Sequence, residues 1–151
     1  MSFEDIVSVI EQAFGLALKI VQDTTVFEVA SDDGDTKVRV LLQAASEHKF
    51  VLLSADLGEV PPEGRERLFQ TMLEANNLFE GTSGATLALD HGTGRFRLQM
   101  YESPDALAND AKAKIDSFIE TALFWSRMIA DFRPEGETPN GDSGGFHVMH
   151  V

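Results

Sequence analysis

The side chains best suited to acid/base catalysis or metal binding near neutral pH are four histidines. His48 and His91 fall in predicted turns, whereas His147 and His150 lie near the C-terminus. The last two have the separation of ligands on one helix, but no helical periodicity surrounds them. Solvent-exposed positions therefore explain the histidines better than a metal or catalytic site does.

Two Gly-containing segments resemble parts of ion-binding or phosphate-binding loops. Asp32-Asp33-Gly34-Asp35 begins like a calcium loop, yet the alternating oxygen ligands and the terminal bidentate Glu are missing. Gly81-Thr82-Ser83-Gly84 lacks the Gly-Lys-Ser/Thr ending of a phosphate-binding loop and leads into a strand. We expect a hairpin turn at the first segment and a helix-to-strand turn at the second.

Nucleophilic catalysis also lacks a recognisable sequence pattern. The chain has no cysteine and no Gly-x-Ser-x-Gly segment, and its carboxylates cluster on the polar faces of predicted helices. Scattered Ser, His and Asp residues can still meet in space, so a hydrolase or metal enzyme stays open as a hypothesis. It requires a polar pocket that brings His48 or His91 together with carboxylates. The sequence favours a protein that is not an enzyme.

Charge and length restrict the partners. The 151 residues suffice for one domain, and 25 acidic against 12 basic residues give a formal net charge of -13. This charge opposes binding to nucleic acid and to anionic membranes, and it keeps a protein with exposed apolar surface soluble. The chain shows no targeting segment and no apolar run near the length of a membrane span. We expect a cytoplasmic protein.

The hydrophobic periodicity predicts elements in the order α-β-β-β-α-β-β-α, which is an α+β fold with helices packed on an antiparallel sheet. Apolar residues recur at helical spacing over about 3–15 and 62–79, and over a long terminal helix from about Ala106 or Asn109 to Phe132. The second of these helices is more apolar than one buried stripe requires, so part of it is expected in an interface. Alternating apolar residues mark the expected strands at about 25–29, 38–44, 50–57, 85–89 and 96–101.

The periodicity ends after Arg133. We therefore expect one domain at 1–133 and a flexible Gly/Pro-rich tail at 134–151. Four apolar residues nevertheless occur near the end of this tail: Phe146, Val148, Met149 and Val151.

The predicted strands and helices carry surplus apolar surface for a chain of this size. Such sheets bind extended peptides by adding a strand at an edge or by seating alternate side chains in apolar grooves. For any single residue, a place in the core is the simpler explanation. Composition and pattern together favour a protein that holds another protein.

Three sequence segments occur in register with this order of elements: Leu57-Gly58-Glu59-Val60-Pro61, Leu73-Glu74-Ala75-Asn76 and residues 81–90. Together they resemble the class I chaperones of bacterial type III secretion, the Tir chaperone or CesT-like family, over about residues 3–132. The resemblance implies a virulence-associated homodimer without catalysis or cofactor. It also implies that the dimer binds the N-terminal segment of a secreted effector in extended form and keeps it soluble and secretion-competent.

By position, the resemblance implies two sets of contact residues. Effector-facing grooves are expected to involve Phe3, Val7, Val38, Val40 and Leu42. The dimer, built around the second helix and an adjoining strand, is expected to involve Leu68, Met72, Ala75, Phe79 and Leu87.

Two questions stay open at this point. A non-secretory protein-binding or regulatory module of the same fold is the alternative function. The tail after Arg133 departs from the family pattern, and it is inert, a client mimic that covers a groove, or partly a remnant of cloning.

Overall fold

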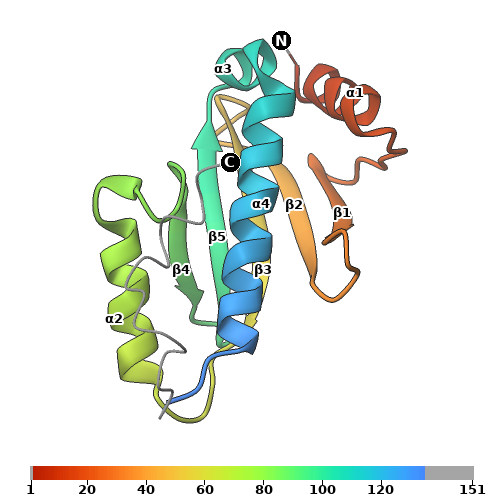
Figure 1. The fold of residues 1–151 in the computed structure, drawn as a ribbon. Coiled ribbons are helices and arrows are strands. Elements are labelled where there is room, and N and C mark those ends of the chain that lie inside the picture. The colour runs from red at the N-terminus through yellow and green to blue at the C-terminus, as the bar shows by residue number, and fades with distance from the viewer. Residues whose placement is uncertain (1, 135–151) are drawn as a thin grey trace.

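Five antiparallel strands form one sheet in the computed structural model, which describes residues 2–134 (Figure 1). The strands are β1 (Thr24–Ala30), β2 (Lys37–Ala45), β3 (Phe50–Glu59), β4 (Thr86–Asp90) and β5 (Arg95–Glu102). Their order in the sheet is β1-β2-β3-β5-β4, so β1 and β4 are the two edge strands. The structure confirms the predicted α+β fold. The predicted tail lies outside the described residues except for Pro134, and the domain boundary stays a prediction.

The helices are α1 (Phe3–Phe14), α2 (Arg65–Asn76), α3 (Pro104–Asn109) and α4 (Ala111–Ala130), and the short 3-10 turn η1 (Asn77–Phe79) follows α2. Two predicted helix bounds were wrong. The terminal helix is divided at Asp110, whose φ and ψ of -149° and 44° interrupt the helix. The second helix begins at Arg65 rather than at residue 62, because the left-handed residue Gly64 precedes its first turn.

The core lies between the sheet and α4, which packs across β2 and β3. Apolar side chains on alternate positions of β2 and β3 face this helix and are buried, as their period of two predicts. Trp125 of α4 is fully buried, and its indole N–H donates to the Gly81 carbonyl oxygen at 2.9 Å. That bond ties α4 to the segment that joins η1 to β4.

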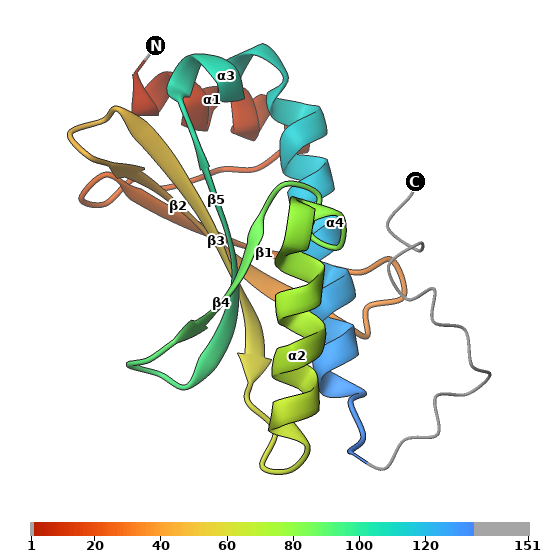
Figure 2. The ribbon, with the colours of Figure 1, turned by 90° about the vertical axis from the view of Figure 1, so that its left-hand side faces the viewer.

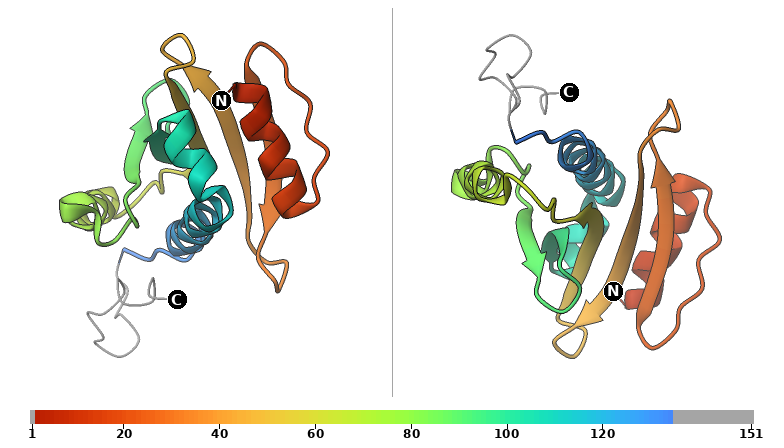
Figure 3. Two further views of the ribbon diagram at one scale, coloured as in Figure 1. Left: turned by 90° about the horizontal axis from the view of Figure 1, so that it is seen from above. Right: turned by 90° about the horizontal axis from the view of Figure 1, so that it is seen from below.

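The helices do not surround the sheet. Figure 3 shows α2 and α1 at opposite sides, with α4 between them. In Figure 2, α4 lies on one side of the sheet, and no helix among residues 2–134 covers the opposite side. The sheet therefore has an inner face that forms the core and an outer face that is open to solvent.

The last described residues run past the start of α2. Gly64 has a φ of +70°, and a Cβ atom at this position would lie 2.6 Å from the Pro134 Cβ and 2.9 Å from the Phe132 Cε1. The left-handed backbone and the close approach both require glycine here. The described chain therefore ends beside the N-terminal end of α2.

Replacement of this glycine provides a test of the close approach. Gly64→Ala should lower the free energy of unfolding by about 1–2 kcal/mol for the left-handed backbone alone, with a further loss from displacing Phe132 and Pro134. Gly34→Ala is the matched control, because Gly34 has a φ of +76° and no atom within 4 Å of its ideal Cβ. Urea denaturation should show the larger loss for Gly64→Ala. Equal losses would contradict the close approach.

An ion pair joins the β1–β2 turn to α4. The Arg127 Nη2 lies 2.8 Å from the Asp33 Oδ2, and the Arg127 Nε donates to the Thr36 hydroxyl oxygen at 3.3 Å. Hydrogen bonds from the Ser31 hydroxyl, the Asp35 backbone N–H and Arg127 lower the pKa of the Asp33 carboxyl to about 2. The ionised form of Asp33 therefore stabilises the fold.

This shift in pKa predicts a pH dependence. Because the pKa of Asp33 is lower in the folded chain than its ordinary value of 3.8, the stabilisation is complete above pH 4 and is lost as the pH falls toward 2. Asp33→Asn should flatten the dependence of the unfolding free energy on pH between 4 and 2. Asp32→Asn is the control, because no hydrogen bond or ion pair of its side chain occurs within residues 2–134. Equal slopes in Asp33→Asn and the parent chain would contradict the assignment.

Candidate functional site

The residues expected to face an effector lie in the core. Each of them is 3% exposed or less, and all belong to the cluster between α1, α4 and the sheet: Phe3, Val7, Val38, Val40 and Leu42. The clean alternation that singled out the strand residues is the pattern of a buried sheet face. Contact with a client would require this core to open, and their role in client binding stays a prediction.

Most of the expected dimer residues are also buried. The side chains that are 6% exposed or less are Leu68, Met72, Ala75 and Leu87, whereas Phe79 is 52% exposed. Their neighbours Leu73 and Leu78 are 70% and 76% exposed, and Leu89 of β4 is half exposed. The helix and strand expected at the dimer interface do present apolar side chains, but these are mainly other residues. The assignment of the original five to a dimer stays a prediction.

The side chain of Asn76 positions α2 beside the sheet. Its Oδ1 accepts from the Leu87 N–H at 2.8 Å, and its Nδ2 donates to the Leu87 carbonyl oxygen at 3.0 Å. The amide thereby pairs with the edge strand β4 as a neighbouring strand would. This pairing closes the middle of the β4 edge and fixes α2 alongside it.

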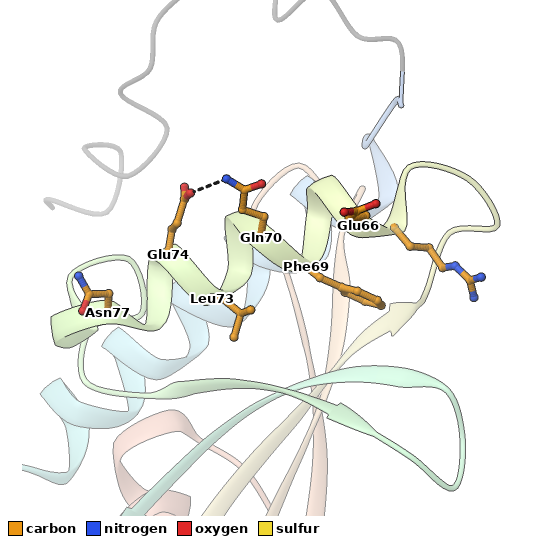
Figure 4. Close-up of a pocket in the computed structure, with 7 residues that line it drawn as sticks. Glu66, Phe69, Gln70, Leu73, Glu74 and Asn77 are labelled. Carbon is orange, nitrogen blue, oxygen red and sulfur yellow. Dashed lines mark hydrogen bonds between the residues drawn. The ribbon is translucent and has the colours of Figure 1, made fainter.

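An apolar hollow of about 260 Å³ lies between α2 and β4. The Phe69 ring packs edge-on against the buried Phe96 ring, with centroids 5.8 Å apart. Figure 4 shows Phe69 and Leu73 on one side of α2, while Gln70 and Glu74 lie on the other side and share a hydrogen bond. Phe69, Leu73 and Leu89 line this hollow, and Leu78 and Phe79 of η1 follow α2 directly. We call these five exposed and half-buried apolar residues the α2–β4 surface.

The backbone at the end of α2 is strained. Leu78 and Phe79 have φ values of 57° and 58°, in the left-handed region that L-residues avoid at a cost of about 1–2 kcal/mol each. Both side chains point into solvent instead of gaining burial within the chain. Left-handed residues also occur in turns of this chain such as Ser46–His48, but two large exposed apolar side chains held in this conformation are a feature that clusters at binding sites. These two residues therefore mark the α2–β4 surface as a candidate interface.

A second apolar surface lies on the outer face of the sheet. Val26 and Leu41 are cross-strand partners, as are Leu52 and Tyr101, and the Phe50 ring packs edge-on against Tyr101 with centroids 6.4 Å apart. We call these five residues the outer sheet surface. They extend from β1 to β5 and have no helix over them within the described chain.

The outer sheet surface adjoins a free strand edge. The hydrogen bonds Ser31 N–H to Thr36 O and Ala44 N–H to Asp23 O show that odd-numbered residues of β1 pair with β2. The N–H and carbonyl groups of Val26 and Glu28 therefore point away from β2. No other strand pairs with β1 in the described residues. These groups are available to an added strand.

A hollow of mixed polarity lies on the outer face, lined by Leu41 and Leu52 of the outer sheet surface and by residues of β4 and β5. Arg97 Nε lies 3.1 Å from the Asp90 Oδ2, and the Ser54 hydroxyl is buried with no hydrogen-bond partner within residues 2–134. Hydrogen bonds from Arg97 and the Gly92 backbone lower the pKa of Asp90. His91, in the β4–β5 turn, also lines this hollow.

Neither His48 nor His91 belongs to a metal-binding arrangement within residues 2–134. His48 lies in the turn after β2, and its Nε2 is 3.4 Å from the half-exposed carboxylate of Asp23. No group of three or more His, Asp or Glu residues in the described part of the chain is arranged to hold a metal ion. His147 and His150 lie outside the described residues. None of the helices between residues 2 and 134 has the length and apolarity to span a membrane.

Comparisons with known proteins identify relatives in sequence and in fold. The model of the Tir chaperone protein (CesT) family matches residues 12–126. A chain of the ExsC–ExsE complex is 21% identical, with a TM-score of 0.62 over 83% of this chain and 91% of that one. A chain of the HopA1–SchA chaperone–effector complex is 14% identical, with a TM-score of 0.62 over 86% and 94%.

A chain of the heterodimeric ExoU–SpcU complex from the type III secretion system of Pseudomonas aeruginosa is 18% identical. Its TM-score is 0.60 over 84% of this chain and 97% of that one. No curated protein matches the sequence. These structural likenesses support the fold described above.

The strain at η1 predicts an unusual response to substitution. Leu78→Asn should raise the free energy of unfolding by up to about 1 kcal/mol, because Asn tolerates the left-handed backbone and Leu78 is mostly exposed. Leu73→Asn, at an exposed and regular helical position, should instead lower it by a few tenths of a kcal/mol to about 0.5 kcal/mol. Denaturation at low chain concentration excludes effects of self-association. A loss above 1 kcal/mol for Leu78→Asn would contradict the strain.

Proposed function

The chain belongs to the Tir chaperone protein (CesT) family, and we propose that it is a cytoplasmic chaperone for a type III secreted effector. It binds the N-terminal segment of that effector in extended form and keeps the effector soluble and secretion-competent. A solved structure with the same fold is a chaperone–effector complex, which supports this assignment. The observation that carries the proposal is the outer sheet surface beside the free edge of β1.

The free edge of β1 suits an extended client. A client strand that pairs with Val26 and Glu28 makes main-chain hydrogen bonds that do not depend on the client's sequence. Alternate side chains of the client then contact the outer sheet surface, first at Val26 and Leu41. Main-chain pairing supplies affinity and the apolar surface supplies selectivity, so a non-globular segment is bound without catalysis.

The α2–β4 surface suits a second copy of the chain. Asn76 already satisfies the Leu87 main chain, so this edge associates through side chains rather than by strand addition. Apolar residues on a helix and a neighbouring strand are typical of a two-fold interface in which both copies use the same surface. The net charge of -13 makes two copies repel at a distance, and the apolar contact must overcome this repulsion.

The same charge explains how the unoccupied chaperone remains in solution. Two exposed apolar surfaces on a small protein favour aggregation, whereas a high net charge of one sign opposes it. A binding module outside secretion would use the same surfaces, and the identity of the bound partner distinguishes the two functions.

Substitution of one edge residue tests the proposal. Tagged parent chain, Val26→Pro and Val26→Thr are each recovered from the native cell, and co-purifying proteins are identified by mass spectrometry. The parent chain should retain an effector, and protease treatment should leave a client fragment of a few tens of residues with two copies of the chaperone. Val26→Pro removes the outward N–H without breaking a β1–β2 hydrogen bond, so it should weaken client binding about tenfold or more.

Val26→Thr is the matched control, because it removes apolar surface but keeps the N–H group. It should bind the client more tightly than Val26→Pro does. Equal client recovery with Val26→Pro and the parent chain would contradict strand addition. A parent chain recovered as a monomer without any partner would contradict the proposed function.

A further inference from the structure

The last described residue, Pro134, lies at the N-terminal end of α2, next to the α2–β4 surface. Pro134 lies against Gly64, directly before the first residue of α2. Phe69, where the apolar hollow begins, is about 7 Å further along the helix at a rise of 1.5 Å per residue. Whatever follows Pro134 therefore starts close to this hollow.

The length of the remaining chain matches the hollow. Residues 135–145 precede the apolar end of the sequence, and four of these eleven residues are glycine. A Gly-rich chain of this length has an r.m.s. end-to-end distance of about 17–20 Å, which is close to the ~18 Å length of α2. A tether whose average reach equals the required span gives its end an effective concentration in the mM range. Even a weak contact is then substantially formed.

The last six residues have the chemistry that the hollow accepts. The hollow is lined almost entirely by apolar side chains: Phe69, Met72, Leu73, Asn76, Leu87, Ala88, Leu89 and Phe96. Phe146, Val148, Met149 and Val151 are apolar, and no acidic side chain lies among residues 146–151.

Charge around the hollow also selects this segment. Glu66 and Glu74 of α2 lie beside the hollow rather than in it and outnumber the one neighbouring cation, Arg65, so an acidic segment is disfavoured there. The acidic residues of the tail, Glu135, Glu137 and Asp142, all precede Phe146. Residues 146–151 are thus the part of the tail whose charge the surroundings of the hollow disfavour least.

We propose that the segment Phe146–Val151 docks in the hollow between α2 and β4 of its own chain and competes with a second copy for the α2–β4 surface. The competition rests on the dimer described under the proposed function. A dimer needs the hollow to be free in both copies. The dimer dissociation constant therefore rises by the inverse square of the fraction of chains whose hollow is free. An occupancy of about three quarters weakens the dimer about 16-fold.

Self-association of the full-length chain tests the competition. Sedimentation equilibrium measures the dimer dissociation constant for the parent chain, for Phe146→Ser and for Ser143→Ala as the matched tail control. Phe146→Ser should tighten the dimer at least fivefold, whereas Ser143→Ala should leave the dissociation constant unchanged. Removal of residues 135–151 should have the largest effect. Equal dissociation constants for the parent chain, Phe146→Ser and the shortened chain would overturn the proposal.

A direct binding measurement keeps the proposal testable if no form dimerises. Residues 2–134 contain the whole described core, so the chain without residues 135–151 is a suitable target. A fluorescent peptide of sequence Gly-Gly-Phe-His-Val-Met-His-Val should bind this target, and Leu73→Asp should abolish binding. Absence of binding at peptide concentrations up to several mM, which match the effective concentration of the tethered segment, would overturn the docking. The proposed function is judged separately, by whether the parent chain retains an effector in the native cell.

Discussion

Two hydrogen bonds between the Asn76 side chain and the Leu87 main chain determine how this molecule can associate. They align α2 with β4 and consume polar groups that an open strand edge would otherwise present. At the β4 edge the Leu87 main chain is thereby paired with a side-chain amide, whereas no other strand pairs with the opposite edge at β1 in the described residues. This difference between the two edges is the basis for proposing strand addition at β1 and side-chain association at α2 and β4.

The distribution of apolar residues follows from a sheet that helices cover on only one face. The inner face, α1 and α4 form a core that includes the fully buried Trp125. The outer face keeps apolar side chains from β1 to β5, and the ion pair between Arg97 of β5 and Asp90 of β4 lies on it as well. The fold is therefore stabilised by one face of the sheet, and no helix within residues 2–134 covers the other face.

The sequence predicted the architecture well because apolar residues largely alternate along the strands and the turns contain the expected glycine or acidic residues. The same alternation places most of the predicted contact residues in the core, and their part in any interface stays a prediction. Val38, Val40 and Leu42 alternate most regularly because they face the core, whereas Leu41 and Leu52 interrupt a regular pattern and lie outside. The strained backbone of Leu78 and Phe79 leaves no periodic signal, and neither does the pairing of Asn76 with an edge strand. Both depend on the tertiary position of α2.

The close contact between Pro134 and Gly64 has a practical consequence for handling the protein. An affinity tag or a fluorescent protein fused after residue 134 would be held beside α2 and would crowd the surface whose association is to be measured. Figure 1 shows that α1 begins at the opposite end of the sheet from the end of α4. A fusion placed before Ser2 would therefore be remote from α2 and would leave the assembly of the chain unperturbed.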